Sequence, residues 1–146
     1  MKKLLCIVLV LVLVFMSSCK SPAVERQKRQ MLEIFCNDDN YITLTGEVTE
    51  INIEDNEVMY MMFVSIKCED LKQYVVNADD YDYWVFCSSD INICIGDTIV
   101  YKTVPNCLDH MGCLPIVEIC KNDETILGFE EGKENLINFV KQIQYK

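Results

Sequence analysis

The sequence predicts a mainly β fold, a small five-stranded antiparallel barrel or twisted sheet with a short helix at each end. Runs in which apolar and polar residues alternate, the two-residue repeat of half-buried strands, recur between residues 41 and 120. Clusters of Asn, Asp, Gly and Pro separate these runs. The chain has 146 residues, of which 51% are hydrophobic, and this is enough for one packed core but not for two. We therefore expect a single β domain.

The first 19 residues have the pattern of a secretion signal. Lys2 and Lys3 precede an unbroken apolar run over residues 4–15, and Met16-Ser17-Ser18-Cys19 follows it. The run is shorter than the ~20 apolar residues of a membrane-spanning helix. A cysteine directly after the cleavage region resembles the lipobox of bacterial lipoproteins. The alternatives are a plain signal peptide and a signal anchor.

The resemblance to lipoproteins implies a division of the chain and a location. Residues 1–18 would be a signal peptide that is removed, and Cys19 would carry the acyl chains. Residues 19–40 would form a lipidated tether with a short helix, and residues 41–146 the β domain with its closing helix. The acyl chains would anchor the protein to a membrane of the bacterial cell envelope, with the domain outside the cytoplasm. Lys20 is not the aspartate that retains lipoproteins at the inner membrane, which favours the outer membrane where one exists.

The expected exported domain is strongly acidic. Without residues 1–18 the chain carries 11 Lys and Arg against 23 Asp and Glu, a formal charge of −12. We expect no nucleic acid partner, because phosphate backbones are bound by basic patches. A basic protein or a cation fits this charge better. The basic residues nearest the expected anchor favour either contact with an anionic leaflet or a solvated helix face, and they are Lys20, Arg26, Lys28 and Arg29.

A short helix is predicted on each side of the strands. Val24, Met31 and Phe35 recur near helical spacing after Pro22, although a partly ordered spacer is the alternative for this segment. Asn and Asp over residues 37–40 end the pattern. Near the carboxyl terminus a closing helix is predicted because four apolar residues fall on one face, namely Leu136, Phe139, Val140 and Ile143.

The first predicted strand contains a bend. The even-numbered positions from Ile42 to Val48 are apolar or Gly, whereas Ile51 and Ile53 continue the alternation out of phase. One extra residue between Val48 and Ile51 would restore the facing, as a β-bulge does, and would bend the strand strongly. The remaining strand predictions are residues 58–68, 74–76, 83–87, 98–103 and 114–120, with Pro115 marking an edge or an entry point.

Three features of these strands resemble the small OB-fold-like domains found in many bacterial lipoproteins. They are the bent first strand around Gly46-Glu47-Val48, the long second strand, and Gly96-Asp97 ahead of Ile99-Val100-Tyr101. The resemblance covers residues 41–120 and implies a five-stranded Greek-key barrel that binds ligands on the face of strands two and three. It implies no reaction, and an irregular β-sandwich is the structural alternative.

Cys107, His110 and Cys113 form the most suggestive local cluster. Sulfur and nitrogen at three-residue steps are zinc ligands, but a closed zinc site needs a fourth, from Asp109, Cys94 or Cys120. In an oxidising envelope a disulfide between Cys107 and Cys113 competes with the metal, and free thiols are the third alternative. Apart from Cys6 and Cys19 the chain has seven cysteines, so at least one has no intramolecular partner.

An acidic and aromatic segment is the candidate ligand face, and it comprises Asp79, Asp80, Tyr81, Asp82, Tyr83 and Trp84. Its carboxylates, with Asn77, are hard oxygen ligands of the kind that calcium prefers, but their spacing does not match an EF-hand, so a solvated acidic loop is the alternative. The rings of this segment and of Phe86 could stack on a sugar or a partner side chain, or could be core on one face and interface on the other.

The sequence contains no phosphate-binding glycine loop, no HExxH helix and no Gly-x-Ser-x-Gly elbow, and it has one His. We therefore expect a non-enzymatic binding module for a protein or a small ligand, without a cofactor. One alternative is an inhibitor or immunity-type lipoprotein that neutralises a basic partner. The other is a metal or redox protein that uses Cys107, His110 and Cys113.

Overall fold

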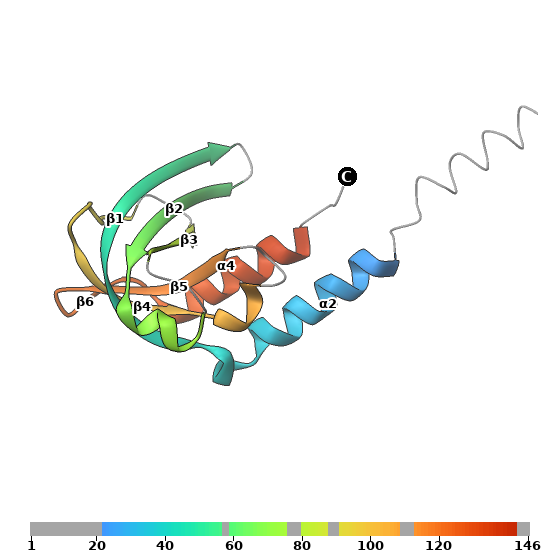
Figure 1. The fold of residues 1–146 in the computed structure, drawn as a ribbon. Helices are drawn as coiled ribbons and strands as arrows, with labels where there is room; N and C mark the ends of the chain where they lie inside the picture. The colour runs from blue at the N-terminus through green and yellow to red at the C-terminus, as the bar shows by residue number, and fades with distance from the viewer. Residues whose placement is uncertain (1–21, 57–58, 76–79, 88–90, 109–112, 143–146) are drawn as a thin grey trace, which may run out of the picture.

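The computed structural model describes residues 22–56, 59–75, 80–87, 91–108 and 113–142 (Figure 1). Six strands form one sheet in the order β3-β2-β1-β4-β5-β6, and an additional β3–β5 pairing closes five of them into a barrel. The predicted β-rich fold is confirmed, as a closed barrel with one further strand. The strands are β1 (Ile42–Asn56), β2 (Met59–Lys67), β3 (Asp80–Cys87), β4 (Thr98–Thr103), β5 (Leu114–Lys121) and β6 (Glu124–Leu127).

Among the described residues, two helices lie beside the barrel, α2 (Pro22–Cys36) and α4 (Phe129–Gln142). Three short 3-10 turns in the same ranges join elements, η1 (Asp38–Asn40), η2 (Glu69–Gln73) and η3 (Pro105–Cys107). In Figure 1 α4 runs along β5, and α2 packs against α4. Within the described ranges, neither helix is long and apolar enough to cross a membrane.

The predicted bulge in β1 is confirmed. Val48 pairs with Ile66 and Glu50 with Ser65, so Thr49 is the extra residue. Before the bulge β1 pairs with β4, and after it β1 pairs with β2 alone. Because the strand bends at the bulge, its first part pairs with β4 and its second part extends along β2. Gly46 lies just ahead of it, where a Cβ atom would overlap the Ile66 side chain, so the strands approach too closely there for any larger residue.

The barrel interior follows the predicted alternation. Met62, Val64 and Ile66 of β2 are buried, as expected for the inward face of this strand. Tyr83 of β3 and Tyr101 of β4 meet inside the barrel with their hydroxyl oxygens 2.8 Å apart. Their rings pack edge to face, with centroids 5.1 Å apart. This pairing satisfies two hydroxyl groups that would otherwise be costly to bury.

α4 closes the barrel on the side of β5 and β3. Leu136 and Val140 are fully buried and Phe139 is half-buried, so the predicted apolar face is confirmed for these three residues. Ile143 lies outside the described residues. Gly132 is buried against β5, where a Cβ atom would overlap the backbone carbonyl of Val117. Glycine at this position therefore sets how closely the helix approaches the strand.

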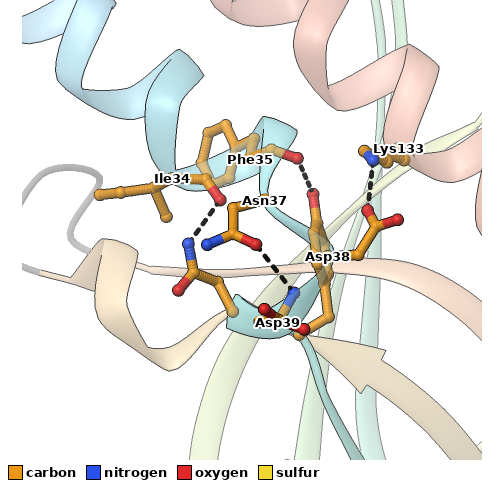
Figure 2. A network of polar contacts seen from close by, with 8 residues as sticks. Ile34, Phe35, Asn37, Asp38, Asp39 and Lys133 are labelled. Carbon is orange, nitrogen blue, oxygen red and sulfur yellow. Dashed lines mark hydrogen bonds and ion pairs between the residues drawn. The ribbon is translucent and has the colours of Figure 1, made fainter.

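The predicted amino-terminal helix is present as α2, and its second half belongs to the core. Met31 and Phe35 are buried in the same cluster as the strand residues. The carbonyl groups at its end are satisfied by side chains, since Asn40 Nδ2 donates to Ile34 O and Tyr41 Oη donates to Phe35 O, both at 2.8 Å. Figure 2 shows this turn and the ion pair that joins Asp38 to Lys133 of α4.

Candidate functional site

The alternation of β3 divides the candidate ligand face into two groups. Tyr83 is fully buried inside the barrel, where it bonds to Tyr101, so its prediction as a surface ligand contact is wrong. Burial, then the neighbouring Tyr83 hydroxyl, raises the pKa of Tyr101 above its usual range. Asp82 and Trp84 point to the opposite, outer face because successive side chains of a strand alternate.

On this outer face Trp84 is the centre of an aromatic cluster. It pairs in register with Phe63 of β2, and the two rings meet edge to face with centroids 5.4 Å apart. Phe139 of α4 lies on another side, 6.1 Å from Trp84 between centroids. Phe86 is fully buried, and its ring centroid lies 4.7 Å from that of Phe139. Phe63, Trp84 and Phe139 are each half-buried, so part of the cluster surface remains open to solvent.

A polar pair borders the aromatic cluster one step along the same face. Ser65 lies opposite Asp82, and its hydroxyl donates a 2.6 Å hydrogen bond to Asp82 Oδ1. Asp82 is exposed, so its carboxylate is presented to solvent in a fixed position. The face therefore combines apolar contact area with one oriented negative charge. We call Phe63, Ser65, Asp82, Trp84 and Phe139 the outer β2–β3 face.

The two cysteines of the suggestive cluster are buried and free. Cys107 Sγ donates to Val104 O at 2.9 Å and lies 3.9 Å from Cys113 O. Burial, then the neighbouring Cys113, raises the pKa of Cys107 to about 12. Burial, then the Asp82 carboxylate, raises the pKa of Cys113 to about 12. Both therefore stay protonated at neutral pH, and a protonated thiol is a weak nucleophile and a weak metal ligand.

The strand register makes the two candidate sites neighbours, and the effect of the Asp82 carboxylate on the pKa of Cys113 agrees with it. They are far apart in sequence, but β3 and β5 pair in parallel, with Tyr83 opposite Leu114. This pairing brings the end of the β4–β5 connection to the outer β2–β3 face.

Several predicted site residues lie outside the described residues, so their predictions are not tested. These are Cys19, Asp79 and His110, together with the side chains of Asp80 and Tyr81, which belong to β3. Among the residues that the structure describes, no three His, Cys, Asp or Glu side chains lie close enough to hold a metal ion. The zinc and calcium hypotheses and the Cys107–Cys113 disulfide stay predictions.

Phe63 and Phe139 belong to the candidate site but were not predicted from the sequence. Phe63 falls on the face of β2 opposite the inward face, and Phe139 was assigned to the buried side of a helix. Only the register of β2 against β3, and the position of α4, bring both residues to Trp84. The alternation of β2 could have predicted that Phe63 faces outward, but it could not have predicted that Phe63 contacts Trp84.

A hollow of about 340 Å³ lies along α4. Its described lining residues all belong to that one helix and mix both charges with one apolar side chain: Glu130, Lys133, Glu134, Ile137, Asn138 and Lys141. Because side chains from different elements do not converge there, the outer β2–β3 face is the stronger candidate.

Comparisons with protein families, with curated proteins and with solved structures gave no match to this chain.

Proposed function

We propose that this protein is a non-enzymatic binding module, anchored by lipid in the bacterial cell envelope, that binds a protein or a small ligand on the outer β2–β3 face. The observation that carries the proposal is the half-exposed cluster of Phe63, Trp84 and Phe139 beside the oriented carboxylate of Asp82. Aromatic side chains provide much of the binding energy in recognition sites, and a neighbouring charge provides orientation.

We propose further that the barrel is of the OB-like kind. Its strands close in the order β1-β2-β3-β5-β4, with the parallel β3–β5 pair completing the ring. OB-like barrels bind their ligands on the face of strands two and three. The aromatic cluster lies on that same face, so the strand order and the side chains support one location for the ligand.

The anchor is proposed from the amino-terminal sequence. Lys2 and Lys3, the apolar run over residues 4–15 and Cys19 support cleavage after residue 18 and acylation of Cys19. Each buried CH₂ of an acyl chain contributes ~0.8 kcal/mol to membrane binding, so several chains on one cysteine hold the protein stably. The anchored domain would then bind its ligand outside the cytoplasm.

The preferred ligand is a protein with a basic side chain beside an apolar one. The basic group would approach Asp82 and the apolar group would pack on Phe63 and Trp84. The formal charge of −12 after residue 18 would steer such a partner toward the domain. This charge also supports the narrower alternative, an inhibitor or immunity-type lipoprotein that neutralises a basic toxin or enzyme.

Affinity capture with matched variants tests the proposal. The domain from Ser21 onward is used to capture proteins from envelope extract, alongside a Phe63→Ala, Asp82→Asn variant. Val100, 41% exposed on the outer side of β4, provides the control substitution Val100→Ser. We expect the wild type and the control to retain the same partner, and the double variant to retain at least about tenfold less of it. Equal capture by all three chains would refute the proposed face.

Salt dependence separates the inhibitor alternative from general ligand binding. If charge steers a basic partner, the association rate should fall steeply as salt is added, because screening shortens the range of the attraction. An association rate that does not change between low and physiological salt removes the inhibitor alternative.

A further inference from the structure

Charge is distributed unequally along the chain, and the boundary between the basic and the acidic segment falls at the end of α2. Residues 20–36 contain four basic and two acidic side chains, whereas residues 37–146 contain seven basic and 21 acidic ones. The first segment therefore has a formal charge of +2 and the second a charge of −14. α2 contains three of the four basic residues of the positive segment, and Lys20 precedes the helix.

The two halves of α2 differ in their contacts. The buried residues of the helix, Met31 and Phe35, lie in its second half. Arg26 and Arg29 in the first half are exposed, and Lys28 is half-buried. In Figure 1 the first turns of α2 project away from the barrel. The basic side chains thus stand at one end of the molecule, on a helix whose other end is fixed in the core.

Helix stability does not explain the position of these charges. The helix dipole favours basic side chains in the last turn, yet the last turn of α2 contains none. The basic residues lie instead in the half that is nearest to Cys19. Their position suits a partner that lies at the amino-terminal end of the helix.

We propose that the first half of α2 docks on the anionic headgroups of the membrane that holds the lipid anchor. This inference rests on the anchoring part of the proposed function. Only two residues, Lys20 and Ser21, lie between Cys19 and Pro22, the first residue of α2. Even fully extended, this step spans about 10 Å, which is about one Debye length at moderate salt. Arg26, Lys28 and Arg29 follow within the next ~10 Å of helix, so they come within this range of the leaflet when the first half of α2 lies along the surface.

The same field orients the whole molecule. A leaflet that attracts the end with charge +2 repels the remainder with charge −14. Docking through α2 therefore holds the barrel away from the bilayer and leaves the barrel surface accessible to partners from solution.

Trypsin cleavage of the full processed protein tests this inference. The protein is reconstituted in vesicles of phosphatidylcholine alone or of phosphatidylcholine with phosphatidylglycerol. We expect cleavage after Arg26, Lys28 and Arg29 to be at least about fivefold slower on the anionic vesicles, the change that corresponds to one basic contact with the surface. High salt should remove the difference. Cleavage after Lys72, exposed on η2, serves as the internal control and should be unchanged.

A pair of variants identifies the side chains involved. Arg26→Gln with Arg29→Gln should abolish the protection of the Lys28 site, whereas Lys67→Gln, an exposed β2 residue, should leave it intact. Equal cleavage on both kinds of vesicle would overturn the docking inference, even if Cys19 is acylated. An unmodified Cys19, found by mass spectrometry, would refute the anchor instead, and salt-sensitive protection on anionic vesicles would then still support docking.

Discussion

Tyr83 and Trp84 are adjacent residues with opposite roles. Tyr83 bonds to Tyr101 inside the barrel, while Trp84 is half-buried on the outer face against Phe63 and Phe139. One of the two alternatives from the sequence was that this aromatic run has a core side and an interface side, but the sequence did not assign each residue to a side. The alternation of β3 places Tyr83 inside and Trp84 outside. How far Trp84 is buried depends on α4, whose position cannot be predicted from local sequence.

Gly132 provides a prediction about packing between α4 and β5. Replacing a helical glycine by alanine normally stabilises a helix by about 1 kcal/mol. At Gly132 the new methyl group would overlap the Val117 carbonyl, so we expect Gly132→Ala to lower the free energy of unfolding by about 2 kcal/mol or more. Gly128→Ala is the control, because a Cβ there has no described atom within 4 Å. Denaturant unfolding measures both, and equal stability of the two variants would contradict the close approach of α4.

The cysteines should differ sharply in reactivity. With pKa values of about 12, Cys107 and Cys113 have about one thiolate in ten thousand at pH 8, and both are also buried. In the reduced folded protein we expect iodoacetamide to label the exposed Cys36 and Cys94 first. Mass spectrometry of the labelled peptides measures the order, and labelling of Cys107 as fast as Cys94 would contradict the burial. In protein isolated without reductant, the predicted disulfide would block Cys107 and Cys113 even after unfolding.

At the scale of elements, predictions from sequence succeeded where the pattern is local. The phase change between Val48 and Ile51 predicted the bulge, because a one-residue insertion reverses every later side chain. β6 was missed because it is short and begins with two exposed polar residues, Glu124 and Thr125. Its turn carried a signal, since Asn122 and Asp123 both have positive φ and these residue types tolerate that conformation.

The ion pair between Asp97 and Lys121 ties the start of β4 to the end of β5, and it makes stability depend on pH. Lys121, then the Cys94 amide, lowers the pKa of Asp97 below its usual value. Asp97 therefore contributes stability above its unfolded pKa of about 4, and this contribution is lost as the pH falls through the lower folded pKa. We expect Asp97→Asn to flatten the decline of the melting temperature in this acidic range.

The matched control for this pair is Glu69→Gln, which neutralises an exposed acid of η2. It should leave the acid dependence close to that of the wild type. The account of the ion pair would be wrong if Asp97→Asn and wild type lost stability in parallel below about pH 4.

At the scale of the whole molecule, charge supports the proposed membrane docking and topology supports the proposed binding face. The sequence alone shows the acidic domain and the basic segment near Cys19. It could not show that α2 is fixed in the core by Met31 and Phe35, which is why a spacer was an alternative. The neighbourhood of Asp82 and Cys113 depends on the parallel β3–β5 pair, a contact between distant segments that local patterns do not predict.

The most direct test of the proposed binding face uses Trp84, which is the only tryptophan in the chain and lies at the centre of that face. Acrylamide quenching of its fluorescence is measured for the domain alone and for the domain saturated with the captured partner. We predict weaker quenching in the complex, because the partner covers the exposed edge of the indole ring, and no such protection with the Phe63→Ala, Asp82→Asn variant. A partner that binds fully while Trp84 remains as accessible as in the free domain would contradict the central claim.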